Sequence, residues 1–413
     1  MHLFASKFVN KPDQVTEVAG SVTTPPGFVA AGIAAGIKKT KKRDLGLLFS
    51  KSSCASATVF TANAAAAPPV KVCRDETENR AIQAIIVNSG CANACTGGQG
   101  LEDARSMVQL TAARLGLKPE LAAAASTGVI GQRLPMEAIE PGIEFAADEL
   151  SVLGGADFAE AIRTTDKVDK EGAVKVELSG GEVSIGACAK GAGMIAPNMA
   201  TLLVFMTTDA AVPAATLQDM LNAAVRGSFN AISVDGDMST NDSVFLLANG
   251  QSGVAIEPGG DDAAIFSQAL TAVCRGLALK MVEDGEGATK VIELNIRGAS
   301  SGREGQRVAN EVSNSLLVKT AFYGRDPNWG RLMAAAGSAL AGEPELAADI
   351  HFEEICLARG GSGEMPDEER LKEIMAEPEI LVTMDLHRGG AGHTMYFSDL
   401  THDYVTLNAE YRT

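Results

Sequence analysis

Short β-rich runs alternate with Ala- and Leu-rich helical patterns along most of this chain of 413 residues. Residues 81–90 (AIQAIIVNSG) predict a buried strand that ends in a turn, and residues 102–117 predict an amphipathic helix that Gly116 closes. Residues 173–191 contain two alternating apolar and polar runs joined by Ser-Gly-Gly, which predicts a hairpin. These patterns constrain the chain to an α/β fold with substantial antiparallel pairing.

The order of the predicted elements divides the chain into two parts. A long helical pattern over residues 263–285 ends at Gly285, and a new succession of strand and helix follows it. We therefore predict a first α/β domain over residues 1–285 and a smaller α/β domain over residues 286–413.

Composition and charge disfavour several classes of protein. The formal charge is −17, from 52 acidic and 35 basic residues, which disfavours binding to nucleic acid or to an anionic membrane. The N-terminal sequence lacks the apolar core of a signal peptide and the Arg-rich pattern of a transit peptide. The unbroken apolar runs are too short to cross a bilayer. These features predict a cytoplasmic protein that contacts neither nucleic acid nor membrane.

The sequence contains no recognisable metal or cofactor motif. It lacks a P-loop, a G-x-S-x-G elbow and a G-x-G-x-x-G turn, and its seven cysteines do not have the spacing of a zinc site. The acidic stretch DGDMSTND resembles a calcium loop, but its glycine stands at the second position instead of the sixth. Apart from His2, the histidines lie at or beyond His351 and outside any catalytic motif. We expect neither a metal nor a cofactor.

A threonine stands where the sequence changes character most abruptly. Residues 190–200 (KGAGMIAPNMA) are rich in small residues, whereas Thr201 begins an almost unbroken apolar run. A threonine hydroxyl is a weak nucleophile that needs an adjacent base, and the base that a threonine itself can carry is a free α-amine. An α-amine titrates near ~7.7–8.0, whereas a backbone amide cannot accept the proton. Thr201 is therefore a candidate nucleophile if it becomes an N-terminus.

Cleavage between Ala200 and Thr201 can be intramolecular. The Thr201 hydroxyl would attack the Ala200 carbonyl, and water would hydrolyse the resulting ester. A glycine-bearing loop before a rigid buried strand would hold the two groups together. The alternative is that Thr201 merely begins a strand because of its β-propensity. The junction alone leaves both interpretations open.

A second stretch, AAAASTGVIGQRLP over residues 122–135, predicts a helix followed by a glycine-rich turn. Gly128 and Gly131 would let the backbone form a concave anion site, to which Thr127 would add a hydroxyl donor. An acyl-transfer enzyme needs such donors to stabilise the oxyanion of its tetrahedral intermediate. The alternative is an ordinary helix C-cap followed by a turn.

Five separated motifs together resemble ornithine acetyltransferase, also called glutamate N-acetyltransferase, a family of arginine biosynthesis. They are STGVIG (126–131), KGAGMIAPNMAT (190–201), FNAISVDGDMSTND (229–242), EDGEGATK (283–290) and GRDPNWGR (324–331). The segments PPGFVAAGIAAGIKK and NSGCANACTGGQGLEDA match as well. The resemblance therefore spans essentially the whole chain.

The resemblance implies a precursor that cleaves itself into an α chain, residues 1–200, and a β chain, residues 201–413. Thr201 would take the acetyl group of N2-acetylornithine as an ester and release ornithine, and glutamate would then leave as N-acetylglutamate. Thr127 and Gly128 would form the oxyanion hole. The substrate contacts implied by position are Thr164, Lys190, Thr201, Glu286, Asn408 and Thr413. Thr165 adjoins Thr164 and is the alternative residue for that contact.

The implied fold is a mixed-sheet α/β sandwich built from both fragments, with the smaller C-terminal α/β domain, assembled as an α2β2 heterotetramer. Two other functions compete with the transferase. An N-terminal-nucleophile aminopeptidase or amidase would use the same self-cleaved threonine with water as acceptor, and a binding protein without catalysis would keep an intact chain. The sequence also leaves open whether acetyl-CoA is a second acetyl donor.

Overall fold

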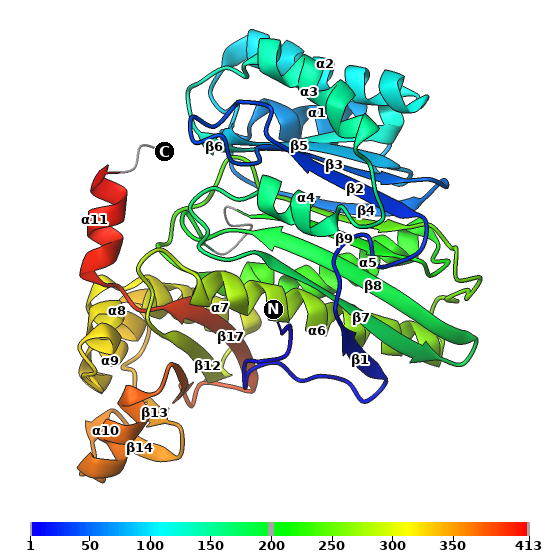
Figure 1. Ribbon diagram of the computed structural model, residues 1–413. Coiled ribbons are helices and arrows are strands. Elements are labelled where there is room, and N and C mark those ends of the chain that lie inside the picture. Colours follow the sequence, from blue (N-terminus) through cyan, green and yellow to red (C-terminus); the bar gives the residue numbers. More distant parts are fainter. Residues whose placement is uncertain (1, 197–201, 411–413) are drawn as a thin grey trace.

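The computed structural model describes residues 2–196 and 202–410, and the strands of these residues form three sheets. Two of the sheets lie face to face, and helices cover the outer face of each (Figure 1). The third sheet belongs mainly to the C-terminal part of the chain and lies below them in Figure 1. The predicted α/β sandwich is confirmed, with its layers in the order helix, sheet, sheet, helix.

The six-stranded sheet combines strands from both sides of the predicted cleavage point. Strand β9 lies inside it, antiparallel to β8 and parallel to β11. In spatial order its strands are β1 (Val15–Val18), β7 (Lys170–Leu178), β8 (Gly181–Lys190), β9 (Leu203–Thr208), β11 (Ser243–Ala248) and β4 (Ala55–Phe60). The hairpin predicted over residues 173–191 is confirmed as β7 and β8.

Strand β9 is apolar on both faces because each face packs against a different layer. Phe205 points into the core between the two sheets, where its ring stacks on Phe245 of β11 with centroids 5.7 Å apart. Val204 and Met206 point the other way, toward helices α5 (Ala214–Arg226) and α6 (Asp261–Glu283). The near-continuous apolar run after Thr201 is thus a strand buried between two layers.

The four-stranded sheet packs on the other side of this core. In spatial order its strands are β2 (Phe28–Ile33), β3 (Leu45–Ser50), β5 (Ala84–Cys91) and β6 (Ala122–Val129). The helices near it are α1 (Pro68–Glu76), α2 (Gly97–Leu115), α3 (Met136–Asp148), α4 (Gly155–Ala161) and the short 3-10 helix η1 (Pro119–Leu121). Helix α3 continues through Pro141, a residue type that usually breaks or kinks a helix, because its buried face still packs on the sheet.

Strand β6 corrects a second expectation. The Ala-rich residues 122–125 form its first half, whereas the sequence predicts a helix there. Ala123 and Ala125 face the core between the sheets, and Ala122 and Ala124 face the outer helices. Small side chains let both layers approach the strand closely, and parallel pairing with β5 overrides the helical preference of alanine.

The C-terminal sheet encloses a separate core built from residues 292–397. In spatial order its strands are β10 (Ile232–Ser233), β17 (Ala391–Ser398), β12 (Val291–Ala299), β16 (Glu379–Asp385), β13 (Asp349–Phe352), β14 (Ile355–Arg359) and β15 (Ser362–Gly363). The remaining helices are η2 (Phe229–Ala231), α7 (Gly302–Asn314), α8 (Leu316–Tyr323), α9 (Trp329–Ala339), α10 (Glu368–Ala376) and α11 (His402–Glu410). Strand β10 joins this sheet although it belongs to the predicted first domain, so the division at residue 285 stays a prediction.

Helix α6 is the one helix among the described residues with the length and apolar character of a membrane span. Its apolar window has a mean hydropathy of 1.3, but 67% of that window is buried inside the protein. It packs beside α5 against the six-stranded sheet and is therefore explained as a core helix. The unbroken apolar runs of the sequence are too short to cross a bilayer. The expectation drawn from them overlooks α6, which reaches the necessary length although polar residues interrupt its apolar pattern.

Candidate functional site

A cavity of about 160 Å³ brings together most of the residues that the sequence nominates for the site. The nominated residues that line it are Thr127, Gly128, Thr164, Lys190, Glu286 and Asn408. Thr165, the alternative to Thr164, lines the cavity too. Ala200, Thr201 and Thr413 lie outside the described residues.

Strand ends explain why these residues meet. Lys190 is the last residue of β8 and pairs with Leu203, the first residue of β9. Leu203 also pairs with Ser243 at the start of β11. The chain therefore leaves the six-stranded sheet at Lys190 and enters it again at Leu203, beside the end of β6 from the facing sheet. Residues far apart in the sequence converge at this edge of the sandwich.

Gly128 sits where β6 and β5 approach most closely. It has a φ of +130°, and a Cβ at this position would lie 2.3 Å from the carbonyl carbon of Gly90. The pairing register shifts between Gly90 and Cys91, so the regular ladder ends here. An irregular strand end releases backbone groups from the ladder, which is what an oxyanion hole requires.

Asn241, in the loop that precedes β11, fixes the end of β6. Its Nδ2 donates to the carbonyl oxygen of Ser126 at 2.9 Å and to that of Ala92 at 2.6 Å. The Ser126 hydroxyl in turn donates to Oδ1 of Asn88 at 2.6 Å. These buried contacts hold Thr127 and Gly128 against the cavity, because buried polar groups that are fully paired resist displacement.

Lys190 places a buried ammonium group in the cavity wall. Its Nζ donates to the Thr164 hydroxyl at 2.8 Å and lies 3.5 Å from the Thr127 hydroxyl. Oδ2 of Asp166 lies 3.8 Å from the same Nζ. Burial lowers the pKa of Lys190, and the charge of Asp166 opposes that change. The cavity therefore offers a desolvated cation suited to a carboxylate.

Asp166 organises the groups behind Lys190. Its Oδ1 accepts hydrogen bonds from Lys170 Nζ at 2.8 Å and from the Gly191 amide at 2.7 Å, and its Oδ2 accepts one from the Thr164 amide at 3.1 Å. Burial raises the pKa of Asp166, but the charges of Lys190 and Lys170 outweigh burial and hold it below its usual range. Lys170 also donates to Oδ2 of Asp284 at 2.5 Å. One carboxylate thus ties together the Thr164 loop, the end of β8 and the residue after it.

A second buried carboxyl, that of Asp242, contacts the residue that follows the predicted nucleophile. The amide of Leu202, the residue that follows Thr201, donates to Oδ1 of Asp242 at 3.0 Å. Burial raises the pKa of Asp242 well above its usual value. Its other oxygen, Oδ2, makes no hydrogen bond within the described part of the chain. Asp242 therefore anchors the first described residue after the predicted cleavage point.

The cavity lining also carries acidic and amide groups. Nδ2 of Asn408, from α11, donates to Oε2 of Glu286 at 2.8 Å. The Glu286 amide donates to the carbonyl oxygen of Ala192 at 2.8 Å, which joins this loop to the segment after β8. Asp235 accepts the amides of Met194 and Ile195 at 2.6 and 2.8 Å and contributes a further carboxylate to the wall. The cavity thus combines carboxylates with the Lys190 ammonium.

The residues that sequence reasoning missed are mostly those that orient the nominated ones. Asp235, Asn241 and Asp242 belong to DGDMSTND, whose glycine position does not fit a calcium loop. Asp166 lies two residues after the nominated Thr164 and has no motif of its own. Its closeness in the sequence to a nominated residue is the signal that could have found it, because groups that perturb each other's pKa gather at functional sites.

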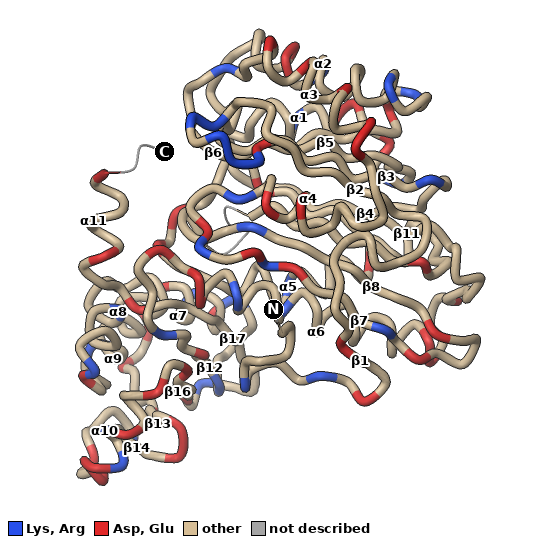
Figure 2. The backbone as a smooth tube through the Cα atoms, viewed as in Figure 1, with Lys and Arg blue, Asp and Glu red and all other residues tan. Residues whose placement is uncertain are grey.

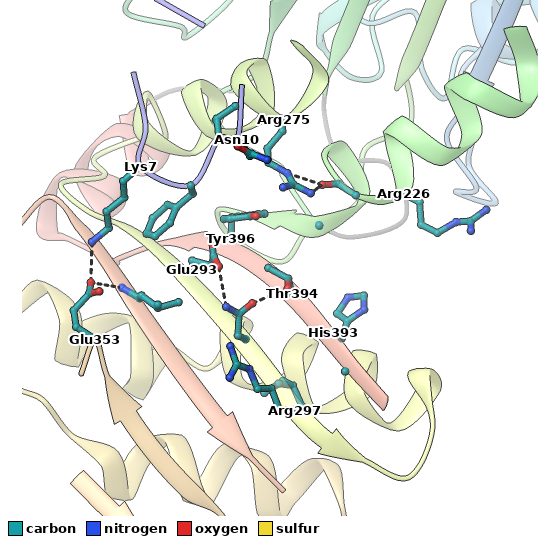
Figure 3. A pocket seen from close by; sticks show the side chains of 18 of the residues that line it. Lys7, Asn10, Arg226, Arg275, Glu293, Arg297, Glu353, His393, Thr394 and Tyr396 are labelled. Atoms are coloured by element: carbon teal, nitrogen blue, oxygen red, sulfur yellow. Dashed lines mark hydrogen bonds and ion pairs between the residues drawn. The ribbon is translucent and has the colours of Figure 1, made fainter. Parts of the chain in front are cut away.

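A larger cavity, of about 1110 Å³, lies on the C-terminal sheet and contains none of the nominated residues (Figure 3). Its floor is the polar face of β12 and β17, where Glu293 and Tyr396 are cross-strand partners. Lys7 borders it and is paired with Glu353 at 2.8 Å. Because alternate residues of β12 fill the core on the other face, this floor has the pattern of a sheet with one solvated face.

Comparisons with known proteins identify the family. The ArgJ family model matches residues 29–413. The arginine biosynthesis bifunctional protein ArgJ of Symbiobacterium thermophilum is 48% identical over 399 residues, which cover 96% of this chain and 99% of the relative. The protein of that name from Bacillus subtilis is 41% identical over 403 residues, or 97% of this chain and 98% of the relative. A crystal structure of ornithine acetyltransferase complexed with ornithine, from Mycobacterium tuberculosis, is 36% identical, covers 46% of this chain and 99% of that one, and has a TM-score of 0.41. This chain therefore belongs to the ArgJ family.

Proposed function

We propose that this protein transfers an acetyl group from N2-acetylornithine to glutamate through an acetyl ester on Thr201. The observation that carries the proposal is the meeting of Thr127, Gly128, Lys190 and Glu286 in one cavity, at the sheet edge from which β9 begins. The family assignment supports a transferase of arginine biosynthesis over an aminopeptidase or amidase.

In the proposed mechanism, the α-amine of Thr201 takes the proton of its own hydroxyl as the oxygen attacks the acetyl carbonyl. The Gly128 amide and the Thr127 hydroxyl donate to the oxyanion of the tetrahedral intermediate. The amide C–N bond then breaks, the α-ammonium returns the proton to the leaving nitrogen, and ornithine departs. Glutamate reverses these steps with its own amine, so that no external cofactor is consumed.

The charges of the cavity support this substrate pair. Lys190 would hold the α-carboxylate that both substrates carry, through a charge-assisted hydrogen bond. Glu286 would accept the side-chain ammonium of ornithine. The Thr164 hydroxyl, which accepts a hydrogen bond from Lys190 at 2.8 Å, would keep the ammonium directed into the cavity.

Intact mass spectrometry tests the proposal directly. We expect two fragments, residues 1–200 and 201–413, and one added acetyl group on the second fragment after brief exposure to N2-acetylornithine. A Thr201→Ala variant is the control and should remain one unmodified chain. An intact, unmodified wild-type chain would rule out the mechanism, and release of free acetate without glutamate would favour the amidase.

The assembly and the second donor follow from the resemblance and rest on it. We propose an α2β2 heterotetramer and acetyl-CoA as an additional acetyl donor for glutamate. The sheet supports a lasting association of the two fragments, because residues 1–200 supply β1, β4, β7 and β8, whereas the later part supplies β9 and β11. Separating them would expose the core between the layers.

An Asp166→Asn variant should shift the pH dependence of kcat/KM. Lys190 binds a carboxylate only below its own pKa, so activity falls as the pH rises through that value. Removing the Asp166 charge lowers the Lys190 pKa further, so the fall in activity at high pH, the basic limb of the profile, should move to lower pH. The other charged groups that act on Lys190 are Lys38, Lys170, Asp242 and Glu286.

The control for this shift is Asp284→Asn. Asp284 is the other carboxylate partner of Lys170 and contacts that lysine instead of Lys190. The Asp284→Asn variant should destabilise the same buried network while leaving the basic limb of the pH profile of kcat/KM nearly in place. Equal displacement of the limb in both variants would show that Asp166 acts only through stability.

Deleting residues 408–413 should abolish transfer while leaving the fold largely intact. No described residue of α11 is buried, so its last turn contributes little to the core. Asn408 nevertheless contacts Glu286 in the cavity wall. Thermal unfolding should change by only a few degrees, whereas kcat/KM should collapse, and Asn408→Ala separates this contact from the rest of the tail. Full activity after the deletion would refute the role of the C-terminus.

A further inference from the structure

The strongest concentration of positive charge in this acidic protein lies on one loop. Residues 37–44 (IKKTKKRD) connect β2 and β3 and carry five cations within six positions. Figure 2 shows these cations gathered beside β6, the strand that bears Thr127 and Gly128. A chain with a formal charge of −17 gains nothing for solubility from such a cluster, so its position calls for an explanation.

The loop is built on a buried anchor. Asp44 is completely buried, and its two carboxylate oxygens accept the amides of Ala35 at 2.7 Å and of Lys38 at 2.8 Å. Gly90, at the end of β5, packs against the loop so closely that a Cβ there would lie 3.0 Å from Cγ of Lys38. The base of the loop is therefore held against the strand ends that form the candidate site.

A cavity of about 500 Å³ lies between this loop and the candidate site. The loop contributes Lys38, Lys39 and Lys42 to its wall, and Arg163 contributes a fourth cation. Thr164 lines both this cavity and the one that contains Lys190. The basic cavity therefore borders, at Thr164, the cavity that contains the predicted oxyanion hole.

The acidic groups at this cavity are already engaged by other side chains. Glu160 pairs with Arg43 at 3.0 Å, and Asp166 is occupied by Lys170 and the Gly191 amide. Lys39 and Lys42 are exposed and form no hydrogen bond or ion pair among the described residues. The cavity therefore keeps an unbalanced positive charge next to the site of acyl transfer.

We propose that the loop of residues 37–44 binds the phosphate groups of a nucleotide-type acyl thioester, whose acyl end reaches the candidate site past Thr164. The inference rests on the proposed function, because it uses the same nucleophile. Lysine ammonium groups bind phosphate as point charges, and several around one cavity suit a ligand with more than one phosphate. In the transfer step the Thr201 oxygen bonds to the acyl carbon, the C–S bond breaks, and the thiol leaves with the proton of the hydroxyl.

A pair of double variants tests the site with coenzyme A as the probe. Lys39→Gln/Lys42→Gln removes the two unpaired cations from the cavity. The matched control, Lys41→Gln/Lys71→Gln, removes two exposed cations that do not line it. We expect the first variant to raise the Kd for coenzyme A by about tenfold, with a weaker dependence of Kd on salt, and the control to bind as the wild type does.

A phosphate-free thioester, S-acetyl-N-acetylcysteamine, completes the test. Its rate of transfer to glutamate should be the same in the wild type and in the Lys39/Lys42 variant, as should transfer from N2-acetylornithine. Equal losses for all donors would overturn the proposal, because the loop would then act on the common chemistry. No binding of coenzyme A to the wild type would also overturn it.

Two further outcomes would assign the loop to another occupant and overturn the proposal. Inorganic phosphate that binds as tightly as coenzyme A would indicate a simple anion site. A change of sedimentation in the Lys39/Lys42 variant alone would indicate that the loop docks a second copy of this acidic chain. Failure of the acetyl adduct to form from N2-acetylornithine, measured separately, would instead count against the proposed function.

Discussion

A Gly128→Ala variant should lose both folding stability and acetyl transfer. Its methyl group would lie 2.3 Å from the carbonyl carbon of Gly90 and 2.6 Å from the amide nitrogen of Cys91, and backbone atoms cannot turn aside as a flexible side chain can. The φ of +130° adds strain, because alanine rarely adopts it. We expect the free energy of unfolding to fall by about 4 kcal/mol or more, measured by denaturant titration.

Gly131→Ala is the matched control for this variant. Gly131 also has a positive φ, of +80°, but a Cβ there would meet no atom within 4 Å. The Gly131→Ala variant should lower the free energy of unfolding by only the conformational strain, about 1–2 kcal/mol, and leave the transfer rate nearly unchanged. Equal effects of the two substitutions would show that strain alone matters and that the contact between β6 and β5 does not shape the predicted oxyanion hole.

Replacing Lys190 by methionine should raise the KM of both N2-acetylornithine and glutamate by about 100-fold. The substitution keeps the length of the side chain but leaves the substrate carboxylate without its cation in a buried site. A hydrogen bond to a charged group is worth about 1.5–3 kcal/mol, and each 1.4 kcal/mol corresponds to a factor of ten. Steady-state kinetics with each substrate varied in turn measures the effect.

Lys319→Met controls for the removal of a buried lysine. Lys319 is buried in the C-terminal part, where its ammonium donates to the carbonyl oxygen of Ser398, and burial lowers its pKa to about 7. Its loss should alter stability but neither KM. Unchanged KM values in the Lys190 variant would remove this lysine from the proposed substrate contacts.

Much of the fold could be predicted from local patterns. The alternation of polar and apolar residues over residues 173–191 indicates a hairpin, and β7 and β8 confirm it. The apolar run after Thr201 predicts a buried strand, which is β9. These predictions succeed because the side-chain period of a strand and the glycine preference of tight turns depend on few neighbouring residues.

Local preference failed where burial decided the conformation. Residues 122–125 favour a helix by composition, but they lie between two packed layers and pair with β5 as part of β6. Pro141 predicts a break, but α3 continues because its apolar face packs on the sheet. In both cases the free energy of packing exceeds the intrinsic preference, which amounts to less than ~1 kcal/mol for alanine and about 3 kcal/mol for proline.

By itself, the sequence determined the class of fold, the threonine at the junction and the motifs of an acyl-transfer family. The tertiary structure alone decided that Thr127, Lys190, Glu286 and Asn408 share one cavity, and that Asp166 and Asp242 lie beneath it. Those residues come from separate strands, loops and a helix, and the layers that join them are set by the packing of distant apolar side chains. Contacts of this kind depend on three-dimensional proximity, which no local pattern of residues encodes.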